Sequence, residues 1–288
     1  MKNMAVGILT ATFCGLAACS STPDASPGQS APGVAPTIDQ LCPALGGTTA
    51  ADCSVDWAAT PEFINCSYSP PCGTGRRPAG LQPAPRLAAR TPSGRLLAEM
   101  AYLEAASVQA FVVLARELEE YGAPPRLCAA SRRAARDEIR HAAVMGKLAE
   151  RADSLVGAVR VERRRRRTLE ALAVENAVEG CVGETYGAAV ARIQAKRAGD
   201  RRFRGVMMRI AADETRHADL SFELARWFDQ QLSPAGRRRV RDARNRAVHE
   251  LARSVRRAAP GSVVVTLGLP TADQATALID ELRRSLWT

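Results

Sequence analysis

The chain has 288 residues, of which 46% are hydrophobic but only 5% are aromatic, a composition that suits a helical core built on alanine, leucine and valine. The formal charge of +10 raises the question of a nucleic-acid partner, but only 3 of the 40 basic residues are lysine, and arginine is in excess over the whole chain. Because no RNA- or DNA-binding motif accompanies this charge, we expect no nucleic-acid partner.

The N-terminus has the pattern of an export signal. Residues 1–18 form the predicted signal peptide, with a short charged start followed by an apolar run that is too short to span a bilayer. The ending Leu-Ala-Ala-Cys at residues 16–19 resembles the bacterial lipobox, which implies cleavage before Cys19 and attachment of lipid to its thiol. A plain signal peptide that is cut elsewhere is the alternative. The lipobox reading predicts an exported lipoprotein that membrane lipid anchors at the cell envelope, facing the periplasm.

Two segments of low hydrophobicity flank a group of cysteines. Residues 19–40 are rich in Ser, Pro, Ala and Gly and predict a flexible tether, and residues 76–92 predict a linker. In residues 41–75 four cysteines occur in a part of the chain that export would place in an oxidising compartment, so we predict two disulfides, with three connectivities open. A zinc or rubredoxin-type iron site is a weaker alternative, because Cys-x-x-Cys pairs are absent from this segment. The four cysteines are Cys42, Cys53, Cys66 and Cys72.

Residues 93–232 are predicted to form four antiparallel helices, which places the chain in the all-α class. The first helix begins near Thr91-Pro92-Ser93, with a cap-like serine, and ends at residues 122–125, where glycine permits a left-handed turn and proline blocks continuation. The second helix follows directly. The third begins after the charged run at residues 160–167, and the fourth follows the turn at residues 198–200.

Residues 233–288 are predicted to be a C-terminal helical extension. An arginine-rich helix at residues 234–258 either covers the bundle with a solvated face or lies against anionic lipid. His249 stands alone within it and is interpreted as structural or exposed. Residues 262–269 are a short β-branched stretch, and residues 270–287 predict a last amphipathic helix.

Four other side chains in the predicted bundle have two interpretations each. Tyr102 and Tyr186 are predicted core residues, with a redox or hydrogen-bonding role beside a metal as the alternative. Cys128 and Cys181 are predicted to be small buried hydrophobic residues, with a disulfide between the two hairpins as the alternative.

Two six-residue stretches are nearly identical. Asp137–Ala142 reads DEIRHA, and Asp213–Ala218 reads DETRHA. Each contains Glu-x-x-His, and residues three apart share one face of a helix, so the carboxylate and the imidazole point the same way. Two of the three histidines in the chain have this spacing. Each pair therefore predicts half of a metal site.

A further glutamate precedes each motif at a matching distance. Glu104 precedes Glu138 by 34 residues, and Glu179 precedes Glu214 by 35. We therefore predict a duplicated helical hairpin, in which each copy contributes one Glu from its first helix and a Glu-x-x-His from its second. Glu184 lies 30 residues before Glu214, a separation that a short hairpin also allows. The predicted ligands are Glu104, Glu138, His141, Glu179, Glu214 and His217, with Glu184, and less favourably Glu175, as alternatives to Glu179.

Four glutamates on the inward faces of one helical bundle require compensating charge, because an isolated charge is costly to remove from water. Two divalent cations carry four positive charges, and the two neutral imidazoles add none. Oxygen and nitrogen donors suit iron or manganese, so we predict two Fe ions, with Mn as the alternative metal. Ion pairs on the helix surface are the alternative interpretation of these residues.

This ligand set resembles that of the ferritin-like di-iron carboxylate proteins, and the D-E-x-R-H form is most similar to that of bacterial multicomponent monooxygenases and related di-iron oxygenases. The resemblance covers residues 93–231, under half of the chain. It implies a ferritin-like antiparallel four-helix bundle with Asp137 and Asp213 behind the ligands. It also implies an oxidoreductase that activates dioxygen or peroxide with electrons from an external donor. A non-enzymatic lipoprotein that captures or stores iron, or a fold with a vestigial site, is the alternative.

Overall fold

The computed structural model describes residues 53–55, 64–66, 75–84, 89–162, 166–256, 259 and 261–287. The chain divides into two units, residues 1–68 and residues 69–288. In the first unit the described residues are strands β1 (Cys53–Val55) and β2 (Ile64–Cys66), which pair antiparallel with Cys53 opposite Cys66. The predicted signal peptide, the tether with Cys19, and the cysteines at positions 42 and 72 lie outside the described residues.

The described part of the second unit is almost entirely helical, which confirms the all-α prediction. One arm is continuous from α4 through the π-helix η2 to α5, because each element begins where the previous one ends. The elements are α2 (Pro92–Glu120), α3 (Pro125–Arg151), α4 (Leu169–Glu175), η2 (Asn176–Glu184), α5 (Thr185–Arg197), α6 (Arg201–Gln231), α7 (Pro234–Ser254), α8 (Gly261–Leu267) and α9 (Ala272–Ser285).

The helix boundaries follow from local capping chemistry. Thr91, not the predicted Ser93, caps α2 by accepting a hydrogen bond from the backbone N–H of Gly94, and proline fills the first helical position. Asp200 caps α6 in the same way. The β-branched stretch near the C-terminus forms the short helix α8, because Val263 and Leu267, four residues apart, are both buried.

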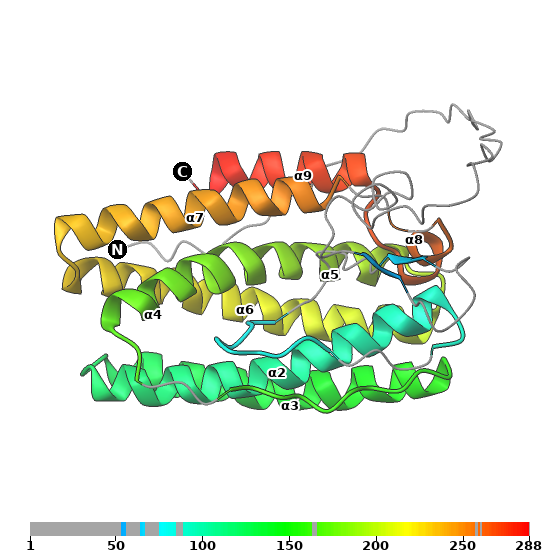
Figure 1. The fold of residues 1–288 in the computed structure, drawn as a ribbon, viewed down its shortest axis with the longest axis horizontal. Coiled ribbons are helices and arrows are strands. Elements are labelled where there is room, and N and C mark those ends of the chain that lie inside the picture. Colours follow the sequence, from blue (N-terminus) through cyan, green and yellow to red (C-terminus); the bar gives the residue numbers. More distant parts are fainter. Residues whose placement is uncertain are drawn as a thin grey trace, which may run out of the picture. The chain divides into compact units, whose positions relative to one another are not determined.

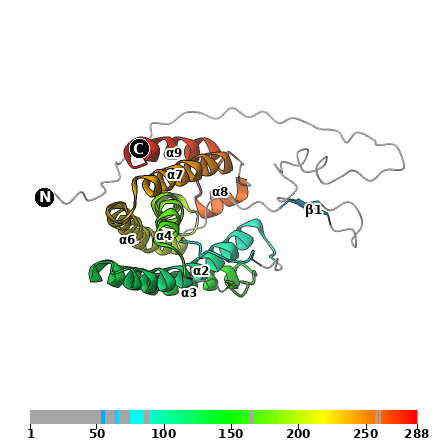
Figure 2. The ribbon, with the colours of Figure 1, turned by 60° about the vertical axis from the view of Figure 1, so that its left-hand side comes forward.

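Two helical hairpins lie side by side (Figure 1). Helix α2 packs against α3, and η2 with α5 packs against α6, while α3 and α6 join the two hairpins. Helix α7 covers α4 and η2, and α9 lies on α7. Figure 2 shows the resulting layers, with α7 and α9 above α4 and α6, and with α2 and α3 below.

The apolar core is divided into two clusters along the hairpins. The first includes Met100 on α2, Met145 on α3 and Met207 on α6. The second includes Phe111 and Leu114 on α2, together with residues near the start of α3 and the end of α6. On α2, α3 and α6 the predicted ligand positions fall between these two clusters. The buried polar groups therefore have an apolar layer on each side along the helices.

Part of the predicted linker packs against the hairpins. We call residues 75–84 the strap. Its Gln82 N–H donates to the carbonyl of Arg160, its Gly80 carbonyl accepts from the Glu162 N–H, and the Tyr102 hydroxyl donates to the Gln82 carbonyl. Tyr102 is thus a buried residue that is bonded to the strap.

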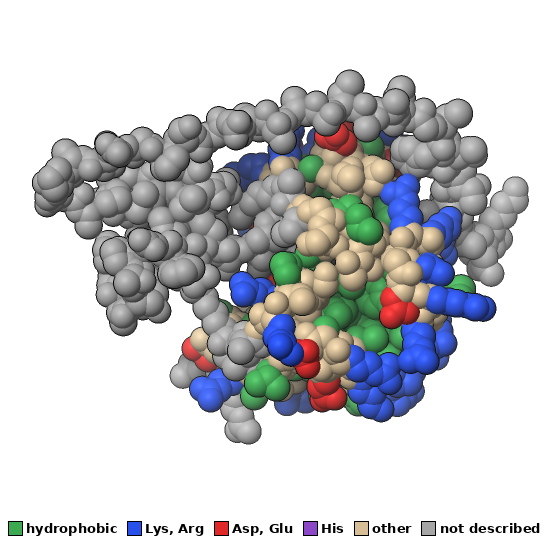
Figure 3. Space-filling model, turned by 90° about the vertical axis from the view of Figure 1, so that its right-hand side faces the viewer, with side chains coloured by type: hydrophobic (Ala, Val, Ile, Leu, Met, Phe, Trp, Pro, Cys, Tyr) green, Lys and Arg blue, Asp and Glu red, His purple; other side chains and the backbone are tan. Residues whose placement is uncertain are grey.

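Surface composition agrees with a dispersed basic charge. On the face drawn in Figure 3, Lys and Arg side chains are interspersed with acidic and apolar ones. Among the described helices, α2 alone is long and apolar enough by itself to cross a membrane, and α8 with α9 pass that test only as a bent pair. Since 56% of the apolar window of α2 is buried in the protein, α2 has the character of a core helix.

Candidate metal centre

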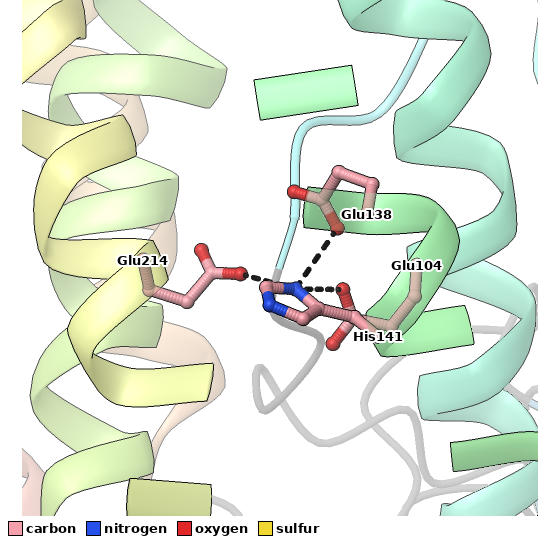
Figure 4. Close-up of side chains that lie close together, drawn as sticks. All are labelled: Glu104, Glu138, His141 and Glu214. Atoms are coloured by element: carbon pink, nitrogen blue, oxygen red, sulfur yellow. Dashed lines mark ion pairs between the residues drawn. The ribbon is translucent and has the colours of Figure 1, made fainter. Parts of the chain in front are cut away.

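Three helices bring four predicted ligands to one point. Helix α2 supplies Glu104, α3 supplies Glu138 and His141, and α6 supplies Glu214. Figure 4 shows the three carboxylates directed at the imidazole of His141. One ligand atom from each residue lies within 4.8 Å of all the others. Atoms bound to one ion at about 2.0–2.2 Å lie at most about 4.4 Å apart, so these four residues could hold a metal ion after small shifts of their side chains.

The distances define the first half of the site. The Nδ1 atom of His141 lies 3.6 Å from Glu104 Oε2, 3.4 Å from Glu138 Oε2 and 3.4 Å from Glu214 Oε1. All four side chains are buried. The space between these atoms is therefore screened from solvent and surrounded by negative charge.

His217 on α6 defines a second half that uses two of the same carboxylates. Its Nδ1 atom lies 3.2 Å from Glu138 Oε1 and 3.8 Å from Glu214 Oε2, the oxygens that do not face His141. The centroids of the two imidazole rings are 6.1 Å apart. Glu138 and Glu214 thus lie between the two histidines, with one oxygen directed to each.

Each predicted aspartate contacts the Nε2 atom of the histidine that belongs to the other hairpin. The Nε2 atom of His141 lies 3.0 Å from Asp213 Oδ2, and the Nε2 atom of His217 lies 3.3 Å from Asp137 Oδ2. A carboxylate can only accept, so it favours the tautomer with hydrogen on Nε2 and leaves Nδ1 free for a metal. Burial alone would raise the pKa of Asp137, but hydrogen bonds with His217 and Arg140 outweigh it and lower this pKa to about 2.

Arginines of the same motifs complete this network. Arg140 pairs with Asp137 on its own helix and lies 3.5 Å from Asp213 on the other. Arg216 does the reverse, pairing with Asp213 and lying 3.5 Å from Asp137. The aspartate, glutamate, arginine and histidine of each motif therefore all have a contact at the centre, which gives a physical reason for the repetition of these four residues.

The fourth carboxylate is not the one that the spacing favoured. Glu179 points away from the cluster, and its Oε2 accepts from the backbone N–H and the Nε–H of Arg77. Its side chain is 17% exposed. The alternative, Glu184, is fully buried and interacts electrostatically with His217, Glu214 and Glu138. The structure therefore brings Glu184, the predicted alternative, to the repeated motifs, whereas Glu179 pairs with Arg77.

The π-helix accounts for this difference. A π-helix forms i→i+5 hydrogen bonds, so each of its turns takes more residues than the 3.6 of an α-helix and the inward face shifts along the sequence. The two glutamates also lie at different distances from the turns of their hairpins, since Glu104 lies 16 residues before the end of α2 but Glu184 only 13 before the end of α5. Equal spacing was consequently a poor guide to this ligand.

The pKa shifts at the centre show that its buried groups favour added positive charge. Burial, and then the charge of Glu138, raise the pKa of Glu104 well above its ordinary value. Burial likewise raises the pKa of Glu184 to about 8, although Arg76 acts in the opposite direction. Burial would lower the pKa of His141, but the neighbouring carboxylates outweigh it and raise this pKa. These shifts all favour the forms with more positive charge, as a bound cation would supply.

Several buried atoms that face the centre have no hydrogen-bond partner. Such atoms are costly in a protein interior unless a ligand or an ion satisfies them. At this centre the atoms without a hydrogen-bond partner include both carboxylate oxygens of Glu138 and Glu214 and the Nδ1 atoms of His141 and His217.

Sequence reasoning missed the buried groups around Glu184. Arg76 lies in the strap and is fully buried, and Ser221 donates a hydrogen bond of 3.4 Å to Glu184 Oε2. A Pro- and Gly-rich segment carries no signal that one of its arginines enters a helical core. Cys128 and Cys181 are both free and buried, which excludes the alternative of a disulfide between the hairpins.

Comparison with known proteins adds no family to these observations. No protein-family model matches the chain, and neither the curated proteins nor the solved structures contain a match.

Proposed function

We propose that the chain is a ferritin-like protein with a carboxylate-bridged di-metal centre, in which α2, α3, the arm from α4 to α5, and α6 form an antiparallel four-helix bundle. The first ion would be held by Glu104, Glu138, His141 and Glu214. The second would be held by Glu138, Glu184, Glu214 and His217. The observation that carries this proposal is the position of Glu138 and Glu214, each with one oxygen facing the Nδ1 atom of either histidine.

Charge and donor type support two iron ions, with manganese as the alternative. The four glutamates carry four negative charges if ionised, and two divalent ions balance them. The donors are carboxylate oxygens and imidazole nitrogens, which favour hard or borderline metals over soft ones. The two aspartates hold the imidazole rings in the orientation that metal binding requires.

The activity that best fits such a centre is oxidation. Two bound iron ions would supply electrons for the activation of dioxygen or peroxide. The protein's own contribution is to bury the ligands between two apolar clusters, which excludes water, and to fix the histidines through the Asp–Arg network. An external donor would have to return the electrons.

One observation favours non-enzymatic metal binding as the second candidate. A cavity of about 920 Å³ is lined by the strap, α2 and the arm from α4 to η2. Its lining includes Tyr102, Glu175 and Glu179, but none of the proposed ligands. Because this cavity does not include the proposed ligands, a substrate bound in it would lie apart from the centre, which suits a metal carrier.

Location remains part of the proposal. Export and lipid attachment at Cys19 would place the centre at the cell envelope, and two disulfides in residues 41–75 would suit an oxidising compartment. Mass spectrometry of the protein from the membrane fraction, with Cys19→Ser as the comparison, tests the anchor. A wild-type chain that keeps residues 1–18, or that lacks a lipid mass at residue 19, contradicts it.

Metal analysis tests the centre itself. Wild-type protein that has been loaded with Fe(II) without oxygen should contain two ions per chain, and admission of air should change its optical spectrum. His141→Ala and His217→Ala should each lower the iron content, because each removes one imidazole ligand. His249→Ala is the matched control, because His249 is exposed on α7 and should leave the iron content unchanged.

The outcomes separate the candidate functions. Consumption of oxygen or peroxide in the presence of an electron donor supports an oxidoreductase. Stoichiometric binding without turnover supports a metal carrier. A wild-type protein that binds no iron or manganese contradicts both, and leaves only the interpretation of a site that has lost its metal.

A further inference from the structure

The strap places a guanidinium in a prepared position beside the centre. Arg76 is fully buried, and its backbone N–H donates to Ser107 Oγ at 2.9 Å. Its Nη2 donates to Asn176 Oδ1 at 2.9 Å and to Ser221 Oγ at 3.2 Å. Gly180 leaves room for it, because a Cβ at that position would lie 2.4 Å from Nη2. The guanidinium is therefore held by side chains of η2 and α6, and the backbone of Arg76 is held by α2.

This buried cation lies between two carboxylates. Its Nε is 3.6 Å from Glu184 Oε1, and its Nη1 is 3.5 Å from Glu175 Oε1. Glu175 also pairs with Arg167, which in turn pairs with the buried Glu117. The guanidinium groups of Arg76 and Arg167 are thus paired with three carboxylates in total. If ionised, three carboxylates carry one more charge than two guanidinium groups neutralise, so Glu184 can attract a further cation while it is in contact with Arg76.

The two halves of the centre are consequently unequal. In the half around His141, four ligand atoms meet within 4.8 Å. In the half around His217, one oxygen of Glu184 faces Arg76 and the other accepts a hydrogen bond from Ser221. An ion that binds beside His217 must draw Glu184 away from these partners, and it must do so in the field of a nearby positive charge.

We propose that Arg76 competes with the second metal ion for Glu184, so that the position at His141 fills first and the position at His217 fills only at higher metal concentration. This inference rests on the proposed di-metal centre and adds an order of filling to it. Arg76 is a positioning residue, because it acts on the metal through Glu184. The strap thereby sets the metal content of a centre whose ligands lie on the helices.

The test is an anaerobic titration of the full chain with Mn(II), with free Mn(II) followed by electron paramagnetic resonance. Wild-type protein should bind two ions in two steps that differ by at least about tenfold in dissociation constant, the scale of a unit charge acting over several ångströms of protein. Arg76→Gln should tighten the second step by about tenfold or more and leave the first nearly unchanged. A single positive charge is thereby removed without removing a metal ligand.

Two further variants make the test specific. Arg77→Gln is the matched control, because the neighbouring Arg77 side chain is 62% exposed and pairs with Glu179 outside the centre; it should bind as wild type does. Glu184→Gln should bind one ion with an unchanged first step. Arg76→Lys, which keeps the charge, should keep two unequal steps even if Arg76→Gln fails to fold.

Each result supports or overturns the inference. An unchanged or weaker second step in folded Arg76→Gln overturns it, as do merged steps in Arg76→Lys or two wild-type steps in Glu184→Gln. If wild-type protein binds two ions but one of these variant results is obtained, only the role of Arg76 is overturned and the di-metal centre stands. Absence of Mn(II) and Fe(II) binding by wild-type protein overturns the di-metal centre itself, and the order of filling with it.

Discussion

Replacement of Glu104 by Gln is expected to stabilise the metal-free protein while it weakens metal binding. The ligand atom of Glu104 lies within 4.8 Å of those of Glu138 and Glu214. At an effective dielectric constant of about 20, two unit charges at this separation repel by about 3 kcal/mol. His141 offsets part of this repulsion, so we expect a net gain of about 1–3 kcal/mol for the metal-free variant at pH 7.

The same gain should depend on pH in a defined direction. Burial and the charge of Glu138 raise the folded-state pKa of Glu104 well above its ordinary value of 4.5. A carboxyl group with a raised pKa lowers stability only above its unfolded pKa, where the unfolded chain is already ionised. The difference between the variant and wild type should therefore grow as the pH rises above 4.5 and should vanish below it.

Thermal unfolding of chelator-treated and metal-loaded protein measures both effects. For a domain of this size 1 kcal/mol corresponds to about 2–4 °C, so the metal-free variant should melt about 2–12 °C above wild type. Metal at about 100 times its dissociation constant should stabilise wild type by about 2.7 kcal/mol and the variant by less. Glu179→Gln is the control and should change neither value, because Glu179 pairs with Arg77 at the surface. A metal-free Glu104→Gln protein that melts below wild type would refute the reasoning, since the carboxylate would then be a net stabilising group.

Three other substitutions test the surroundings of the centre. Asp213→Asn leaves the Nε2 atom of His141 without its carboxylate partner and should lower metal affinity by about 10–100-fold in a metal titration, whereas wild-type affinity would contradict the proposed support. Gly180→Ala places a Cβ against the buried guanidinium and should lower the unfolding free energy by about 1–3 kcal/mol. Gly146→Ala, where nothing lies within 4 Å of the added Cβ, should raise it by about 1 kcal/mol. Changes of the same sign in the two unfolding free energies, measured in urea, would contradict the packing. Trp287→Phe removes the indole N–H that donates to a carbonyl of η2 at 2.7 Å and should cost about 1–3 kcal/mol, a prediction that an unchanged melting temperature would reject.

Most of the centre was predictable because its spacing is local. Glu138 with His141, and Glu214 with His217, lie three residues apart, and any α-helix that contains such a pair directs both side chains to one side. Glu104 was predictable because α2 and α3 are regular helices joined by a short turn. Lipid attachment remains a prediction, because Cys19 lies outside the described residues. The disulfides also remain a prediction, because Cys42 and Cys72 lie outside them and only the strand pairing is described for Cys53 and Cys66.

The sequence by itself predicted the helical class and the positions of five candidate ligands, because helical periodicity converts residue spacing directly into direction in space. Only the tertiary structure shows that Glu184 lies among the buried charged groups while Glu179 pairs with Arg77, because the π-helix breaks that periodicity. It alone placed Arg76 at the centre, 100 residues in sequence from Asn176 and 145 from Ser221, the side chains that bind it. Contacts over such separations depend on how the hairpins pack, which no local pattern encodes.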